Sequence, residues 1–417
     1  MLGTGETPSD DHGCSQISPQ IGITNTPVID KGAGNGDGAM YFVAMSKDSS
    51  GNYHQRLHAL DLRTGGELYG GPVEIAATYP GTGDGSQGGQ VIFNAAKYAE
   101  RSAILEFGGT IYITFTSHCD ARPYTGWVMA YNPRTLAQTS VIDITPNGSE
   151  GAVWMAGSGL AADSSGNIYL LAGNGTFDTT LTSQGFPING DYGNGFVKLS
   201  ATGGTLAVAD YFNMFNTVQE SNADTDLGSG GAIILPDITD NNGAVHHLAV
   251  GAGKDTNIYV VNRDNMGKWN SSNNNNAYQV LNGAMPGGVW SKPSYFNNTV
   301  YYGGVGDHLK AFGISNAKLT TSPTSQSSNT FPYPGTFPLI SANGSTNGIV
   351  WAVSNSNPAV LYAFDATNLA TQLYNSNQAS GGRDQFGNGN KFITPIVANG
   401  QVFVGTQTGV AVFGLLH

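Results

Sequence analysis

Seven copies of one strand-and-turn unit run along the chain, and this repetition constrains the fold more than any other feature. Each copy contains an apolar strand, a Gly or Asn turn, a second strand that ends near glycine, and a third strand of the type LHALDLRTG. Three or four strands of period two, separated by turns, are typical of one β-propeller blade. The copies begin near Thr26, Ser102, Gly157, Gly230, Gly288, Phe337 and Lys391.

We therefore expect an all-β chain that forms a single seven-bladed β-propeller, with eight blades as the second possibility. Seven copies in 417 residues give about 60 residues per copy, which predicts long loops. The last copy has three clear strands, so the segment before Thr26 is expected to supply a fourth and close the ring through the chain ends. We assign residues 1–20 to a polar N-terminal arm and 21–417 to the propeller. A parallel β-solenoid is the alternative, although its repeats are usually shorter and more uniform.

The charge balance bears on possible partners. The chain has 17 Lys and Arg against 29 Asp and Glu, a net charge of −12, and it contains no basic cluster. Such a chain repels phosphate backbones and anionic membrane surfaces, so nucleic acid is not an expected partner. The sequence contains no apolar run of about 18 residues, so no membrane span is expected. We expect a monomer.

The two cysteines, Cys14 and Cys119, bear on the cellular compartment. Their spacing fits one long-range disulfide and a pair of free thiols equally well. Few lysines beside many Asn, Gly and Thr residues indicate a secreted or periplasmic protein, and this composition favours the disulfide. The N-terminus has neither a basic segment nor an apolar segment of a signal peptide, so the sequence reads as a mature form.

Polar side chains in Gly-rich turns are the candidate functional residues. Asp224 and Asp226 are separated by one residue in NADTDLGSGG, which suits a concave oxygen site for Ca²⁺ and equally suits a solvated turn. Asp120 lies in the SHCD loop and could instead pair with Arg122. Asn174 lies in Asn-Gly-Thr, which is also a glycosylation acceptor pattern and a plain turn. Lys254 follows Gly-Ala-Gly, where a salt bridge to Asp255 or Asp226 would be a purely structural role.

Four segments in order resemble the pyrroloquinoline-quinone (PQQ) alcohol dehydrogenases. They are VWMAGSGLAADSSGNIYLLAGNGTFD, GDYGNGFVKLS, NADTDLGSGGAIIL and HLAVGAGKDTNIYVVNRDNMG. The resemblance covers about residues 26–270, and the remaining chain is similar only to generic quinoprotein-like repeats. It also extends to secreted bacterial quinoprotein-like propellers that share the strings TPVID, LHALDL, SHCD, NGSEG and GNGTFD.

The resemblance implies a role for each matching residue. In that family a quinone lies in the propeller axis beside a divalent ion, usually Ca²⁺. Asn174 matches the amide ligand of the ion, and Asp120 takes the place of a glutamate ligand. Asp226 matches the general base, and Lys254 matches the cation beside the quinone. Trp154 is the approximate counterpart of the tryptophan floor under the cofactor.

The sequence also departs from the family pattern. The adjacent cysteine pair that covers one face of the quinone is absent, since Cys14 and Cys119 stand far apart. Gly228, two residues after Asp226, is not a further acid, which fits the calcium type rather than the lanthanide type. A propeller that retains the ion and has lost the quinone is therefore also compatible with the sequence.

Three functions remain open from the sequence. The first is a PQQ- and Ca²⁺-dependent dehydrogenase that oxidises a small alcohol or a carbohydrate, with Asp226 and Lys254 catalytic. Trp154, Lys254 and Asn174 would then contact the cofactor, and Asp120, Asn174, Asp224 and Asp226 would hold the metal. The second is a non-catalytic propeller that binds a glycan or a protein. The third is a propeller polysaccharide lyase or hydrolase that uses Asp120, His118 and Lys254.

Overall fold

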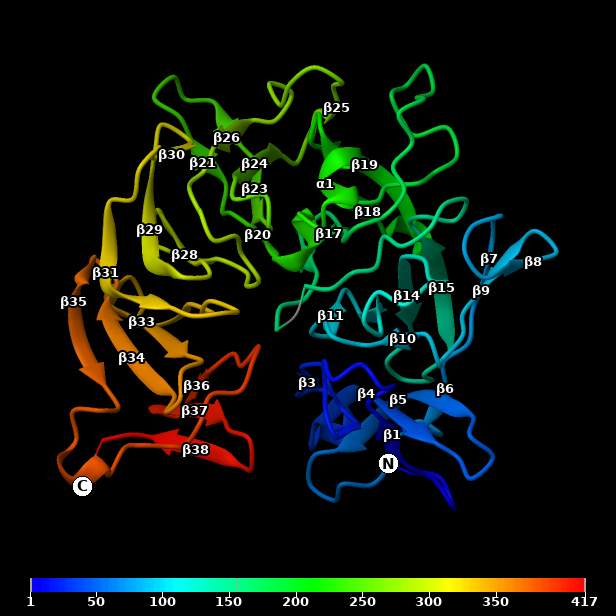
Figure 1. Cartoon of the computed structure of the whole chain (residues 1–417), viewed down its shortest axis with the longest axis horizontal. Helices are drawn as coiled ribbons and strands as arrows, with labels where there is room; N and C mark the ends of the chain where they lie inside the picture. The colour runs from blue at the N-terminus through cyan, green and yellow to red at the C-terminus, as the bar shows by residue number, and fades with distance from the viewer. Residues whose placement is uncertain (1, 156, 416–417) are drawn as a thin grey trace. The chain divides into compact units, whose positions relative to one another are not determined.

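A computed structural model describes residues 2–155 and 157–415. The chain divides into two compact units, one formed by residues 1–228 and 268–273, and the other by residues 229–267 and 274–417. Both units consist of short antiparallel meanders, and the one α-helix of the described residues is α1 (Thr217–Asn222) (Figure 1). No described helix has the length and apolar character needed to cross a bilayer.

The first unit contains three main sheets, which coincide with the first three sequence repeats (Figure 1). The first sheet comprises β2 (Gln20–Ile21), β1 (Thr7–Asp10), β4 (Ala39–Lys47), β5 (Tyr53–Asp61) and β6 (Val73–Glu74), and β3 (Val28–Asp30) also pairs with β4. The second comprises β11 (Leu105–Phe107), β12 (Thr110–Thr114), β14 (Trp127–Tyr131) and β15 (Gln138–Asp143). The third comprises β16 (Ala161–Ala162), β17 (Asn167–Leu171), β18 (Phe196–Ser200), β19 (Ala207–Asn213) and the parallel β25 (Lys268–Trp269).

Two smaller sheets complete the first unit. One pairs β10 (Tyr98–Ala99) with β13 (Thr116–Ser117), and the other joins β7 (Thr78–Pro80), β9 (Gln90–Ile92) and β8 (Ser86–Gln87). Aromatic and aliphatic side chains of the main sheets form two apolar cores, in which Trp127, Phe115 and Tyr211 are fully buried. These cores hold the strand ends, and therefore the loops between them, in fixed positions.

The second unit contains four main sheets, which coincide with the last four repeats. The first of these comprises β20 (Ala232–Ile234), β23 (Leu248–Ala252), β24 (Ile258–Asn262) and β26 (Gln279–Leu281), and the second comprises β27 (Ser294–Phe296), β28 (Thr299–Gly303), β29 (Asp307–Ser315), β30 (Lys318–Leu319) and β31 (Ser325–Phe331). The third comprises β32 (Leu339–Asn343), β33 (Thr346–Ser354), β34 (Val360–Asp365) and β35 (Asn368–Asn375). The fourth comprises β36 (Ile396–Ala398), β37 (Gln401–Gly405) and β38 (Val410–Phe413). A further hairpin pairs β21 (Ile238–Thr239) with β22 (Val245–His246).

The turn sequence DSSGN occurs twice, and the two copies fold alike. The Asp48 carboxylate accepts hydrogen bonds from the backbone N–H groups of Ser50 and Asn52, both at 2.8 Å. Asp163 accepts the equivalent bonds from Ser165 at 2.9 Å and Asn167 at 3.0 Å. An aspartate that bonds its own turn in this way explains why the same letters begin a hairpin in two different repeats.

The N-terminal strands pair with the first sheet, since Thr7 lies opposite Lys47 and Pro8 opposite Ser46. The last sheet has three strands. The expected fourth strand from the N-terminal segment is therefore not confirmed among the described residues, and the number of blades and ring closure stay predictions. The segment TPSD has no apolar alternation, which is why its pairing partner is not evident from the sequence.

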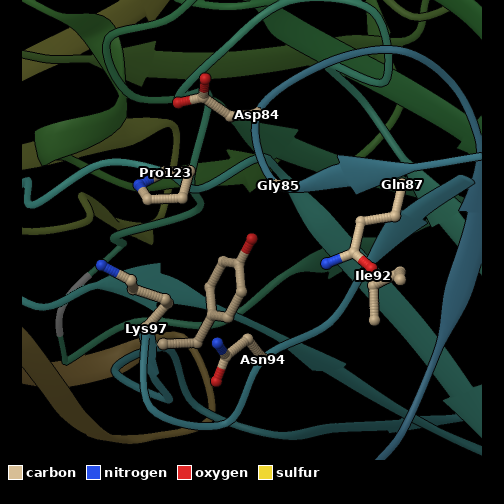
Figure 2. Close-up of a pocket in the computed structure, with 8 residues that line it drawn as sticks. Asp84, Gly85, Gln87, Ile92, Asn94, Lys97 and Pro123 are labelled. Carbon is tan, nitrogen blue, oxygen red and sulfur yellow. The ribbon is translucent and has the colours of Figure 1, made fainter.

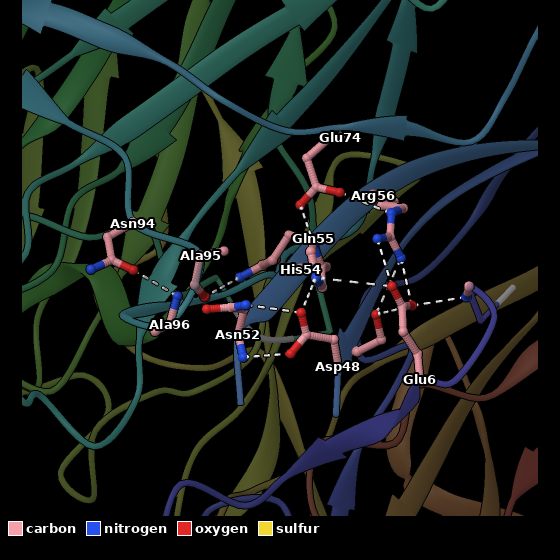
Figure 3. A network of polar contacts seen from close by, with 12 residues as sticks. Glu6, Asp48, Asn52, His54, Gln55, Arg56, Glu74, Asn94, Ala95 and Ala96 are labelled. Carbon is pink, nitrogen blue, oxygen red and sulfur yellow. Dashed lines mark hydrogen bonds and ion pairs between the residues drawn. The ribbon is translucent and has the colours of Figure 1, made fainter. Parts of the chain in front are cut away.

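Two interactions fix this N-terminal segment to the first unit. The Arg56 guanidinium donates two hydrogen bonds to Glu6, at 2.7 and 2.8 Å, and also pairs with Glu74 at 2.8 Å (Figure 3). The bond to Arg56 lowers the pKa of the Glu6 carboxyl to about 2. Cys14 and Cys119 form a disulfide across a sequence separation of 105 residues, which confirms the expected pairing.

Candidate functional site

The turn after β17 brings Asn174 and Asp224 into direct contact within the first unit. The Asn174 side-chain amide donates a 2.7 Å hydrogen bond from Nδ2 to Asp224 Oδ1. The C-terminal end of α1 is fixed to the same turn, because Gly175 N–H donates to Ser221 Oγ at 2.7 Å. With its NH₂ group on a carboxylate, Asn174 turns its Oδ1 away, and this oxygen is buried without a hydrogen-bond partner among the described residues. An amide oxygen in this state is available to a ligand.

Asp226 lies on a segment that packs against the same turn. Its side chain is buried, and the residue after it, Leu227, donates its N–H to Asn194 Oδ1 at 2.7 Å. A Cβ atom at Gly228 would lie 2.3 Å from both the Ala172 carbonyl carbon and the Gly173 nitrogen. Only glycine permits this approach, so the backbone that carries Asp226 lies next to the residues that lead into Asn174.

Trp154 borders this turn on another side. A Cβ atom at Gly173 would lie 2.8 Å from Trp154 Cδ1, so the indole lies directly against the backbone that precedes Asn174. The Arg101 guanidinium carbon is 5.9 Å from the centre of the indole ring, within cation–π range. The indole is half-buried and offers a flat apolar surface beside Asn174.

Asp120 is connected to the same turn through Glu150. Tyr124 donates from its hydroxyl to Asp120 Oδ1 at 3.2 Å, and its carbonyl accepts the Glu150 N–H at 2.7 Å. The next residue, Gly151, donates its N–H to the Asn174 carbonyl at 2.5 Å. The sequence offered Arg122 as an alternative partner of Asp120. In the structure Arg122 instead donates two hydrogen bonds to Asp84, at 2.7 and 2.8 Å.

Glu150 is a further candidate residue of this site, and the sequence did not single it out. Burial raises the pKa of its carboxyl, Arg122 opposes this rise, and the charges of Asp120, Asp84 and Asp224 raise the pKa further. Asp120 and Asp224 therefore both act electrostatically on Glu150. Its place in the string NGSEG, shared with the similar propellers, is the one indication that the sequence offers.

Lys254 lies in the second unit, in the turn after β23, where its backbone borders Gly288. Its expected place beside the four residues of the first unit stays a prediction. No group of three or more His, Cys, Asp and Glu side chains within 2–155 and 157–415 is arranged to hold a metal by itself. A cation at Asn174 would therefore need amide, backbone or cofactor oxygens in addition to carboxylates.

Three further side chains of the first unit are buried. Trp127 and Tyr124 are fully buried in the core. His118 is buried and stacks on His12 with ring centres 3.9 Å apart. Burial lowers the pKa of His118 to about 4, so its imidazole is neutral near pH 7. The lyase or hydrolase that would use His118 stays a prediction.

A small cavity lies beside the Asp120 loop in the first unit (Figure 2). Its volume is about 200 Å³, and Lys97 and Asp84 provide charges of opposite sign in its wall. Lys97 donates to the Arg122 carbonyl at 3.3 Å, which connects the wall to the Asp120 loop. The lining residues are Asp84, Gly85, Gln87, Ile92, Asn94, Lys97, Tyr98 and Pro123.

Comparison with known proteins identifies the fold. The chain is similar to the quinohemoprotein alcohol dehydrogenase of Pseudomonas putida HK5, with a TM-score of 0.51 and 14% identity over 92% of this chain and 69% of that chain. The quinohemoprotein alcohol dehydrogenase of Comamonas testosteroni gives 0.48 and 14% over 96% and 72%, and BamB of Moraxella catarrhalis gives 0.39 and 12% over 82% and 92%. No protein-family model and no curated protein matches the sequence. The chain has a quinoprotein-like β-propeller fold.

Proposed function

We propose that the first unit binds a divalent cation, Ca²⁺ by preference, at Asn174 together with Asp226, Asp224 and Asp120. The observation that carries the proposal is the Asn174 amide, whose NH₂ group is held by Asp224 while its buried Oδ1 has no partner among the described residues. Hard cations prefer amide and carboxylate oxygens. The amide oxygen is also the ligand that the family resemblance assigns to this position.

We further propose that the site holds PQQ and oxidises a small alcohol or a carbohydrate. The Trp154 indole, which lies against Gly173, would support the flat face of the quinone. When bound, the quinone with its cation would supply an electron acceptor that protein side chains lack. The adjacent cysteine pair of the family is absent, so the opposite face of the quinone would need a different cover.

In this proposal, side chains of the first unit accept the proton of the substrate and determine the charge around the cation. Asp226, on the buried segment beside the turn, would accept the proton of the substrate hydroxyl. Asp224 would hold the Asn174 amide so that Oδ1 faces the cation. Glu150 would add negative potential, since its carboxyl interacts with both Asp120 and Asp224. The role that the resemblance implies for Lys254, which lies in the second unit, stays a prediction.

We also propose that the protein works in an oxidising compartment, secreted or periplasmic. The support is the Cys14–Cys119 disulfide, a linkage that persists mainly outside reducing compartments.

Reconstitution tests the proposed activity. The purified chain is incubated with PQQ and Ca²⁺, desalted, and examined for quinone absorbance and for dye reduction with a panel of primary alcohols and aldoses. We expect retained quinone and turnover of at least one substrate class, and we expect Asn174→Ala to lose both. Failure of the wild-type chain to retain quinone would contradict the dehydrogenase proposal, while Ca²⁺ binding alone would support an ion-binding propeller.

A further inference from the structure

Three aromatic side chains form a continuous run in the second unit, outside the site described above. The ring centres of Trp290 and Tyr333 are 5.6 Å apart at an interplanar angle of 75°, and those of Tyr333 and Phe392 are 6.2 Å apart at 84°. Tyr333 is 46% exposed, and the other two residues are half-buried. We call these three residues the aromatic arc.

The three rings lie in segments that precede the first strands of three successive sheets. Trp290 precedes β27 by four residues, Tyr333 precedes β32 by six, and Phe392 precedes β36 by four. Each ring thus lies just before the first strand of a different sheet. Phe392 has a left-handed backbone with φ of 64°, which is costly for a bulky residue and is held by the surrounding structure.

The loops that carry the arc are fixed to one another. Asn355 donates from Nδ2 to the Tyr333 carbonyl at 3.1 Å. Gly389 packs against Asn355 so closely that a Cβ atom there would lie 2.4 Å from Asn355 Oδ1, and its N–H donates to the Ser356 carbonyl at 3.0 Å. The backbone segments that carry Tyr333 and Phe392 are therefore held before any ligand arrives, which lowers the entropy cost of binding.

Lysines accompany the arc. Lys391 Nζ lies 6.0 Å from the centre of the Tyr333 ring. Lys292 follows Trp290 by two residues, and Ser291 between them is buried. Lys292 is solvent-exposed, yet desolvation by the surrounding protein lowers its pKa. An anion beside Lys292 would oppose this shift by stabilising the charged ammonium.

We propose that the aromatic arc, with Lys292 and Lys391, is a binding site for an acidic oligosaccharide built of uronic acid units. The apolar faces of successive sugar rings would stack on the arc, and their carboxylates would pair with the lysines. The rings of the arc stand nearly perpendicular to one another, so they provide no parallel slot for a planar aromatic ligand. This geometry favours a chain of sugar rings over an aromatic polycarboxylate.

Calorimetry with tri- to hexameric oligogalacturonate tests this proposal on the chain without added quinone or Ca²⁺, so the outcome does not depend on the proposed oxidation. We expect saturable binding that weakens as salt rises, and weakening on the order of tenfold in Tyr333→Ala. Tyr333→Phe retains the ring and should bind as the wild type does. Lys391→Gln should weaken the acidic ligand and leave any binding of neutral cello-oligosaccharide unchanged.

Lys318→Gln is the matched control, because Lys318 also lies over a tyrosine of the second unit, 4.0 Å from the Tyr278 ring centre, outside the arc. It should bind oligogalacturonate as the wild type does. The proposal is overturned if oligogalacturonate does not bind, if Tyr333→Ala binds it unchanged, or if PQQ alone binds with an affinity that Tyr333→Ala abolishes. Equal binding of neutral and acidic oligosaccharides would overturn the role of the lysines.

Discussion

The two units share one repeat pattern and differ sharply in charge. The first contains 22 acidic and 10 basic residues, which accounts for the whole net charge of −12, whereas the second contains seven of each and no glutamate. In the first unit the acids Asp120, Glu150, Asp224 and Asp226 occur in loops beside one amide. In the second, Lys391 lies near the exposed Tyr333 ring. The same strand framework therefore carries different side chains in its two units, and we propose a cation site in the first and an anion site in the second.

Asp226→Asn, in the acidic first unit, should have the largest effect on activity. The change retains the shape of the side chain and removes its ability to accept a proton, so we expect dye-linked alcohol oxidation to fall by about 10²–10⁴-fold. The melting temperature should change little, because a buried charge is replaced by a neutral isostere. Asp37→Asn makes the same change at an exposed position of the first unit and should leave activity intact. Equal loss in both variants would contradict the role of Asp226.

Removal of the disulfide should destabilise the first unit and leave the second unit unchanged. Cys14→Ser with Cys119→Ser opens a loop that spans 105 residues, which costs about 4 kcal/mol of unfolding free energy in the chain-entropy model. Both cysteines lie in the first unit, so hydrogen exchange should rise in peptides of β4 and β5 and stay unchanged in β33 and β34. Uniform loss of protection across both units would show that they unfold together.

Buried acids give the first unit a distinctive pH dependence. Burial raises the pKa of Asp191 from 3.8 to about 7 and that of Asp143 to about 6. The folded chain therefore keeps these protons where the unfolded chain releases them, and stability falls as the pH rises from about 4 to 7. Asp191→Asn should raise the unfolding free energy relative to the wild type by roughly 2–4 kcal/mol more at pH 8 than at pH 5 in urea titrations.

The second unit provides the contrast for this measurement. The pKa of Asp365 is lowered, because its carboxylate accepts bonds from the Thr367 hydroxyl and N–H. Asp365→Asn should therefore destabilise the chain more at pH 8 than near pH 3, the opposite sign. A variant of Asp191 whose effect is the same at pH 5 and pH 8 would contradict the assignment of a raised pKa.

The smallest expected effect concerns the stability of the aromatic arc. Because Tyr333 is 46% exposed, Tyr333→Ala should change the unfolding free energy by no more than about 1 kcal/mol. Val350→Ala, at a fully buried position of the same unit, should cost more. A large loss from Tyr333→Ala would indicate a packing role for this ring instead of a binding role.

The sequence predicted the repeated sheets because strand alternation and turn residues are local properties. It also predicted that Asn174 and Asp224 lie together, and the two side chains form a hydrogen bond, whereas their functional role stays a prediction. It did not predict that Glu150 interacts with Asp120 and Asp224, or that the aromatic arc forms, because both depend on loops that only the folded chain brings together. The pairing of β1 (Thr7–Asp10) with β4 was not predicted for the same reason. The Glu6–Arg56 ion pair and the Cys14–Cys119 disulfide, which fix this segment, join residues that are far apart in the sequence.

Ca²⁺ titration of the wild type and of Asn174→Ala, followed by calorimetry, tests the central claim most directly. The account predicts one site per chain in the wild type and loss of that site in Asn174→Ala, while Asn270→Ala, an exposed asparagine of the same unit, retains it. Absence of Ca²⁺ binding in the wild type, or equal binding in Asn174→Ala, would contradict the assignment of a cation site to this turn.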